Sequence, residues 1–168
     1  MNALFIGRFQ PFHKGHLQII QYASLDYDKI IIGIGSSQYK CTTDNPFSSE
    51  ERQQMIDDTL KNLDIGNYEI VLVPDIHNYP KWVVHVASII TDFDVVLTNS
   101  SLTKSLFEEQ GFEIRETPIF ERKKYSGKEI RKKMINDEKW EDLVPEPVVK
   151  IIKKIDGVNR LRELAKKQ

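Results

Sequence analysis

Two histidines lie three residues apart in the stretch GRFQPFHKGH, residues 7–16, which continues an apolar run at residues 3–7. His13 falls near the expected start of a helix and His16 about one turn later, so the two side chains should occupy neighbouring positions. A helix N-terminus supplies free N–H groups and a partial positive charge. Two imidazoles beside such a terminus add further hydrogen-bond donors. The pattern therefore predicts a binding site for an anion.

Other chemistries fit these residues less well. A catalytic zinc ion takes three protein ligands, and the chain offers only His77, His85 and the single Cys41 beyond the first two histidines. The sequence contains neither GxxxxGK[ST] nor GxGxxG, which disfavours a P-loop and a dinucleotide fingerprint. A purely structural role for the two histidines stays open as the alternative.

A second candidate for anion binding is the basic stretch RKKYSGKEIRKK at residues 122–133, which sets seven basic side chains against Glu129. Residues 1–120 hold 9 basic and 16 acidic side chains, whereas residues 121–168 hold 15 basic and 9 acidic ones. Ser126 and Glu129 have the spacing of a capping box at a helix start. The stretch is either a solvated helix face or a helix N-terminus that seats phosphates, with Arg131 in its first turns.

Strands and helices are expected to alternate along the first 120 residues. This alternation predicts an α/β fold with a Rossmann-like open parallel sheet of about five strands, flanking helices and a helical C-terminal segment. In such a sheet, ligands bind beyond the C-terminal ends of the strands, where the loop after the first strand lies. The spacing of Ser48 and Glu51 predicts another capping box, with a structural role. We expect strands at 3–7, 29–35, 68–74, 94–98 and 112–116, and helices at 14–25, 48–63, 80–90, 102–110, from 126, from 145 and over 158–167.

Length and composition indicate one globular domain, with a sheet core at 1–120 and a helical part of the same domain at 121–168. Of the 168 residues, 40% are hydrophobic and 29% charged, and apolar runs reach only about seven residues, too short to span a bilayer. The first twenty residues lack the pattern of a signal peptide, and the single Cys41 excludes an internal disulfide. These features predict a cytoplasmic protein that does not bind or span a membrane.

The stretch GRFQPFHKGH is similar to the GxFxPxHxGH signature of the HxGH nucleotidyltransferases, which share a Rossmann-like fold with class I aminoacyl-tRNA synthetases. The stretch YSGKEIRKKM, residues 125–134, is similar to the second signature of that family. Within it, nearly the whole chain resembles the archaeal nicotinamide-nucleotide adenylyltransferases. The supporting stretches are IIGIGSSQ, NPFSSEER, DIHNYPKWVVHV and EKWEDLVP.

The resemblance implies that ATP and nicotinamide mononucleotide react to give NAD and pyrophosphate, with Mg²⁺ on the triphosphate. It implies catalytic roles for His13, His16 and Arg131. A homo-oligomer, often a hexamer in the family, is implied as well. The implied ATP-binding residues are Gly7, Arg8, Phe9, Gly35, Tyr125, Ser126 and Gly127, and those for the mononucleotide are Ile76, Asn78 and Trp82. The chain departs from the family in having Lys128 in the second signature, and Asn99-Ser100-Ser101 instead of Gly-Asn-Pro after the fourth strand.

Three alternative functions are compatible with parts of this pattern. Another nucleotidyltransferase of the same fold would use pantetheine phosphate, FMN or glycerol phosphate as the acceptor. A non-catalytic nucleotide-binding module would retain the anion site without turnover. An RNA-binding protein would use the basic segment, but the sequence shows no RNP-like aromatic strand and no KH loop, so we expect no nucleic-acid partner.

Overall fold

The computed structural model describes residues 1–117 and 124–167, and the chain forms two compact units. The sheet unit contains Met1–Gly7, Ile19–Ser37 and the described part of Asn67–Ile119. The helical unit contains Arg8–Gln18, Gln38–Gly66 and the described part of Phe120–Gln168.

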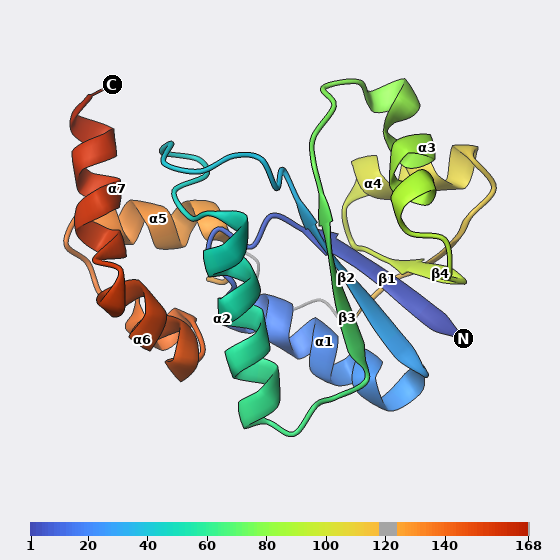
Figure 1. Ribbon diagram of the computed structural model, residues 1–168, viewed down its shortest axis with the longest axis horizontal. Helices are drawn as coiled ribbons and strands as arrows, with labels where there is room; N and C mark the ends of the chain where they lie inside the picture. The colour runs from blue at the N-terminus through green and yellow to red at the C-terminus, as the bar shows by residue number, and fades with distance from the viewer. Residues whose placement is uncertain (118–123, 168) are drawn as a thin grey trace. The chain divides into compact units, whose positions relative to one another are not determined.

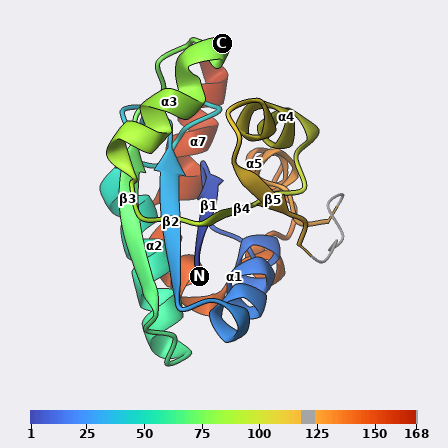
Figure 2. The same cartoon turned by 90° about the vertical axis from the view of Figure 1, so that its right-hand side faces the viewer.

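All five strands belong to the sheet unit and run parallel. The order across the sheet is β3-β2-β1-β4-β5, and Figure 2 shows β3, β2, β1 and β4 in this order from left to right. The central strand β1 is apolar and is buried at Ala3, Leu4 and Phe5, as expected of a parallel sheet with covered faces. The strands are β1 (Asn2–Gly7), β2 (Lys29–Gly35), β3 (Tyr68–Val73), β4 (Val95–Leu97) and β5 (Glu113–Arg115).

One face of the sheet packs against helices α3 (Tyr79–Ile89) and α4 (Ser101–Glu109). In the parallel register Leu4 lies opposite Ile31 on β2 and opposite Val96 on β4, so these three side chains form one layer. The helices contribute buried side chains to the same cluster. The remaining buried members are Val73, Val83, Val86, Ile90 and Phe107, with Trp82, Phe93 and Phe112 packed against them.

The helical unit is built from α2 (Ser49–Asn62), α5 (Gly127–Ile135), α6 (Glu146–Lys154), α7 (Gly157–Lys166) and a short 3-10 turn at Glu141–Leu143. It also contains the first turn of α1 (Lys14–Asp26), whose residues from Ile19 onward belong to the sheet unit. Within the helical unit, α2 packs against α6, and α5 and α6 pack against α7 (Figure 1). Buried side chains include Phe9, Phe12, Phe47, Met55, Ile56, Leu60, Ile130, Met134, Val148, Ile152 and Leu161.

The predicted five-stranded parallel sheet is confirmed, and every predicted helix is present. The fourth and fifth strands are shorter than expected, three residues each. The predicted boundary near residue 120 lies outside the described residues, as do residues 122 and 123 of the basic segment. The helical unit reaches further than the predicted C-terminal part, because it also takes in residues 8–18 and 38–66. That the whole chain is one domain stays a prediction.

None of the described helices is both long enough and apolar enough to cross a membrane.

Candidate functional site

The two histidines form a reciprocal cap at the start of α1. The backbone N–H groups of Gly15 and His16 donate to Nδ1 of His13, at 3.1 and 3.3 Å. In return, the backbone N–H of His13 donates to Nδ1 of His16 at 3.1 Å. This is the bond pattern of a capping box, with imidazoles in place of the usual hydroxyl and carboxylate. The two rings stack with their centroids 3.5 Å apart.

These bonds fix the tautomer of both rings. Because each Nδ1 accepts a hydrogen bond, a neutral ring must carry its proton on Nε2, where it is a donor. Burial lowers the pKa of His13 to about 3. Burial, followed by the charge of His13, lowers the pKa of His16 well below its ordinary value. At neutral pH the protein therefore holds two uncharged Nε2–H donors side by side.

The neutral imidazole cap should make the fold sensitive to acid. An unfolded histidine takes up a proton below about pH 6.5, whereas His13 in the fold resists protonation down to about pH 3. The stabilisation is fully present above pH 6.5 and is lost as the pH falls toward 3. Between pH 7.5 and 5.5 we expect the free energy of unfolding to drop by about 1 kcal/mol for each histidine, measured by urea titration.

Two variants test this assignment. His13→Asn keeps an oxygen that can accept the cap bonds but cannot titrate, so it should remove about half of the acid-dependent loss. His77→Asn is the control, because His77 is exposed and has a left-handed backbone that asparagine tolerates. Equal acid sensitivity of His13→Asn and the wild-type protein would contradict the assignment.

Arg131 lies in the same unit and contacts the loop that carries the histidines. Its Nη1 donates to the backbone carbonyl of Gln10 at 2.7 Å, and the side chain is only 6% exposed. This is its one hydrogen bond within the described residues, so further guanidinium N–H groups are available to a ligand. Burial, followed by repulsion from Arg8, lowers the pKa of Arg131, while Asp44 opposes the shift.

The start of α5 places Arg131. Ser126 caps the helix, because its hydroxyl accepts a hydrogen bond from the backbone N–H of Glu129 at 3.1 Å. This is the first of the two bonds of the predicted capping box. The preceding Tyr125 lies close to the start of α1, since a Cβ added to Gly15 would be 3.0 Å from the Tyr125 Cβ. The predicted residues of the second signature thus gather near the imidazole pair.

Gly127 leaves the space that the Arg131 guanidinium occupies. A Cβ at this position would lie 2.8 Å from Nη1 of Arg131 and 3.1 Å from the carbonyl of Gln10. In Gly127→Ala we expect the guanidinium to move away from the Gln10 carbonyl, with a moderate loss of Tm because this buried acceptor loses its donor. The affinity for inorganic tripolyphosphate, measured by calorimetry, should fall about tenfold, the loss of one charge-assisted hydrogen bond.

Gly66→Ala is the matched control, because a Cβ there meets no atom within 4 Å. It should leave both tripolyphosphate affinity and thermal stability unchanged. If Gly127→Ala binds tripolyphosphate as tightly as Gly66→Ala does, the position of Arg131 does not govern anion binding.

Like charges gather around this loop before any anion is bound. Arg52 is fully buried, and burial followed by repulsion from Arg8 lowers its pKa to about 10. Arg8 itself is exposed, yet it opposes the charge on both Arg52 and Arg131. A bound polyanion would relieve this repulsion, so the electrostatics favour a ligand with several negative charges.

Two residues of this region were not identified from the sequence. The side-chain amide of Gln10 donates to the carbonyl of Phe47 at 2.9 Å and accepts from its N–H at 3.0 Å, as a neighbouring strand would. Arg52 binds backbone carbonyls of the same region. A glutamine at position 10 or an arginine at position 52 forms no recognisable local motif, because the partners are far away along the chain.

Phe9 is one of the predicted ATP contacts. Its ring is 1% exposed and packs in a T-shaped contact with His16. Only the backbone of Phe9 therefore remains for contact with a ligand.

The residues predicted to bind the mononucleotide lie in the sheet unit, after β3. Asn78 caps α3 by accepting from the backbone N–H of Lys81 at 3.2 Å, and Ile76 is exposed. Trp82 is half-buried, and its ring meets that of Phe107 edge-on at 5.5 Å. The indole therefore packs partly against the core and keeps part of its surface open to solvent.

Gly7 and Gly35 are the last residues of the neighbouring strands β1 and β2 in the same unit. In the parallel register Gly7 lies opposite Ile34, the residue before Gly35. A Cβ at Gly35 would be 3.6 Å from the Gly7 carbonyl, an ordinary contact. Packing alone therefore does not require a glycine at 35. After β4, Asn99 forms two hydrogen bonds with Thr117, at 2.6 and 3.0 Å, so this turn is held by side chains.

The described residues contain no group of three or more His, Cys, Asp or Glu side chains that could hold a metal ion. Mg²⁺ commonly binds through substrate phosphates and water with few protein ligands.

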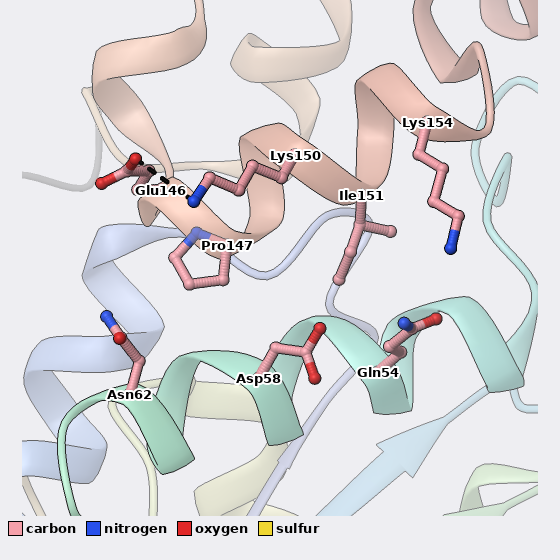
Figure 3. Close-up of a pocket in the computed structure, with 8 residues that line it drawn as sticks. All are labelled: Gln54, Asp58, Asn62, Glu146, Pro147, Lys150, Ile151 and Lys154. Carbon is pink, nitrogen blue, oxygen red and sulfur yellow. Dashed lines mark ion pairs between the residues drawn. The ribbon is translucent and has the colours of Figure 1, made fainter.

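A separate groove lies between α2 and α6 in the helical unit (Figure 3). It contains no predicted site residue and mixes charges, with Glu146 paired to Lys150 at 3.5 Å. We therefore assign the candidate site to the imidazole pair and not to this groove. The lining residues are Gln54, Asp58, Asn62, Glu146, Pro147, Lys150, Ile151 and Lys154.

Comparison with known proteins gives a consistent picture. Residues 4–133 match the family model described as cytidylyltransferase-like. The chain is 48% identical to a nicotinamide-nucleotide adenylyltransferase of Thermoplasma volcanium, over 98% of this chain and 92% of that protein. It is 47% identical to the protein of the same name from Methanococcus maripaludis, over 99% of this chain and 97% of the relative.

A solved structure from Francisella tularensis is similar with a TM-score of 0.78 and 27% identity. That protein is a bifunctional NMN adenylyltransferase/ADP ribose pyrophosphatase in complex with AMP and a manganese ion. The match covers 96% of this chain, which spans about half of the bifunctional protein, 52% of its length.

Proposed function

The chain belongs to the cytidylyltransferase-like family, and from this premise we propose that it is a nicotinamide-nucleotide adenylyltransferase of NAD biosynthesis. The proposed reaction joins ATP and nicotinamide mononucleotide to give NAD and pyrophosphate. The relatives that match nearly the whole chain carry this name. The structural observation that carries the proposal is the imidazole pair, which presents neutral Nε2–H donors in the unit that also holds Arg131.

In this reaction an oxygen of the mononucleotide phosphate forms a bond to the α-phosphorus of ATP. The bond from that phosphorus to the bridging oxygen breaks, and pyrophosphate leaves with the electron pair. The attacking phosphate is already ionised at pH 7, because its second pKa is about 6. No side-chain base is required, and catalysis consists of positioning and electrostatic stabilisation.

The residues of the helical unit fit this task. We assign His16 to the α-phosphate, where its neutral Nε2–H donates as charge develops in the transition state. His13, Arg8 and Arg131 bind the rest of the triphosphate, and the N-terminus of α5, with Ser126 and Gly127, receives the β- and γ-phosphates. Tyr125 and the backbone of Phe9 border the same anion. Gly7 and Gly35 are assigned to the adenosine.

We further propose Mg²⁺ as the divalent ion. When bound with the nucleotide, it would neutralise part of the triphosphate charge and stabilise the charge that the leaving pyrophosphate acquires. The solved relative with AMP contains manganese, which supports the use of a divalent ion by that protein. Because the described residues offer no cluster of metal ligands, the ion would enter with the nucleotide.

The mononucleotide is assigned to Ile76, Asn78 and Trp82, with the indole face on the cationic pyridinium ring. Removing that face in Trp82→Ala should raise KM for nicotinamide mononucleotide about tenfold to thirtyfold, the value of a desolvated cation–π contact, while KM for ATP stays unchanged. Trp82→Phe should recover part of the loss because an aromatic face remains. Steady-state kinetics with each substrate varied in turn measures both effects.

Phe107→Leu separates this role from core packing, because Phe107 is fully buried and its ring lies 5.5 Å from that of Trp82 in a T-shaped contact. It should lower Tm without changing KM for the mononucleotide. A Trp82→Ala protein with a lowered Tm and no selective change in that KM would make Trp82 structural and reopen the choice of acceptor.

Pyrophosphate release tests the function as a whole. The protein is incubated with ATP, Mg²⁺ and one acceptor at a time: nicotinamide mononucleotide, pantetheine phosphate, FMN or glycerol phosphate. We expect release only with the mononucleotide, together with formation of NAD. Release with a different acceptor would identify another nucleotidyltransferase, and nucleotide binding without any release would identify a non-catalytic module.

The other expected properties are proposals of the same kind. We propose a cytoplasmic homo-oligomer, a hexamer by family resemblance, that binds its nucleotide substrates and neither nucleic acid nor membranes. Sedimentation of the purified protein tests the oligomeric state.

A further inference from the structure

Arg52 is the largest fully buried side chain of the described chain, with 0% exposure, although it carries a guanidinium. It lies in the first turn of α2 and reaches three backbone carbonyls. Nε donates to Ser48 at 3.1 Å, Nη1 to Arg8 at 3.0 Å and Nη2 to Tyr39 at 3.3 Å. One planar group thus joins the start of its own helix to Tyr39, 13 positions away, and to Arg8, 44 positions away.

The bond to Arg8 is the one that concerns the anion site. Arg8 opens the loop that leads to His13, and its own side chain is exposed while its carbonyl is held by Arg52. Two residues further on, Gln10 is held at its side chain by Phe47 and at its carbonyl by Arg131. The loop is therefore fixed at Arg8 and at Gln10 by hydrogen bonds of buried side chains. Water could replace these bonds only if the side chains packed around Arg52 and Arg131 moved apart.

We propose that Arg52 is a positioning residue for triphosphate binding, which acts by fixing the Arg8 carbonyl and thereby the direction in which the Arg8 side chain leaves the loop. The inference rests on the proposed function only in that the anion is a triphosphate. A guanidinium suits this role because its donors form a rigid fork that serves three acceptors at once. A lysine would carry the same charge, but its compact ammonium group cannot span the three carbonyls.

The first test measures binding of inorganic tripolyphosphate by calorimetry, which needs no acceptor substrate and no turnover. We expect Arg52→Lys to weaken binding about tenfold although the charge is kept. Met55→Ala is the matched control, because Met55 is fully buried on the same helix and its truncation lowers stability without removing a hydrogen bond to the Arg8 carbonyl. We expect Met55→Ala to lower Tm by at least as much while binding tripolyphosphate within twofold of the wild-type protein.

The second test asks whether Arg52 acts through Arg8. Arg8→Met removes the guanidinium that is proposed to contact the anion. If Arg52 acts by orienting this group, Arg52→Lys should cost less than about twofold in the Arg8→Met background, although it costs about tenfold in the wild-type background. Tenfold losses that multiply in the double variant would show that Arg52 acts independently of Arg8 and would overturn the proposal.

Two other results would also overturn it. One is Arg52→Lys binding tripolyphosphate within twofold of the wild-type protein. The other is an equal loss of binding in Arg52→Lys and Met55→Ala, which would reduce Arg52 to a contributor to stability. These outcomes are distinguishable from failure of the proposed function. A protein that binds tripolyphosphate in the predicted Arg52-dependent way but releases no pyrophosphate with nicotinamide mononucleotide would keep the positioning role and lose the assigned acceptor.

Discussion

His16→Asn is expected to lower kcat by about two to four orders of magnitude while KM for ATP and Tm change little. The structure makes asparagine the informative replacement. Its side-chain oxygen can accept the hydrogen bond that Nδ1 of His16 receives from the backbone N–H of His13, but nothing replaces the Nε2–H donor. The lost donor acts mainly on charge that develops in the transition state, so kcat carries the effect.

His16→Ala is the companion variant, because it removes the donor and the cap together. It should show the same loss in kcat and, in addition, a free energy of unfolding lower by the amount typical of a lost helix cap, about 1 kcal/mol. Single-turnover measurements establish that the chemical step is affected. A His16→Asn enzyme with wild-type kcat would end the electrostatic role assigned to this residue.

Arg131→Met is expected to raise KM for ATP, and the dissociation constant of pyrophosphate in the reverse direction, by about ten- to a hundredfold. Both ligands carry the phosphates that the guanidinium is proposed to bind, and a hydrogen bond to a charged group contributes about 1.5–3 kcal/mol. The variant also leaves the carbonyl of Gln10 without its buried donor. We therefore expect a lower Tm alongside the kinetic change.

Lys132→Met is the matched control on the neighbouring position of α5. It removes one positive charge from the same helix, but Lys132 is exposed. Its kinetic constants should stay within twofold of the wild-type values at moderate ionic strength, where exposed charges are screened. If Lys132→Met weakens ATP as much as Arg131→Met does, the basic helix attracts the nucleotide only through its overall charge. If Arg131→Met weakens the mononucleotide alone, Arg131 belongs to the other substrate.

The sequence by itself determined the helices and strands, their order along the chain, and the family. Buried parallel strands are short apolar runs, so the first four were visible as such, whereas the fifth (EIR) is a weaker pattern with a single apolar residue. Capping devices are local, and the predicted capping box of Ser48 and Glu51 is complete because both partners lie within one helical turn. The motifs around His13 and Ser126 are local as well, which is why the resemblance to nucleotidyltransferases could be identified and is confirmed by the comparisons.

The spacing of the histidines predicted that they would be neighbours, but not what their nitrogens bind. Helix α1 begins at Lys14, so His13 is the cap that precedes the helix and does not lie on its face. Which ring nitrogen accepts a backbone N–H depends on the turn of the loop before the helix. The tautomer, and with it the identity of Nε2–H as the donor, was therefore decided by the folded backbone.

The support around the site was decided by tertiary structure alone. Arg52 binds the carbonyl of a residue 44 positions away, Gln10 binds one 37 positions away, and Arg131 reaches back over 121 positions. No periodicity or local motif encodes such pairs, because their partners are backbone groups that any residue type provides. Trp82 shows the same limit, since an apolar helix allows both a core tryptophan and an exposed aromatic face, and its edge-on contact with Phe107 exists only in the packed unit. Local spacing specifies what a residue can donate or accept, whereas the distant segments that fold against it determine which of those bonds are made.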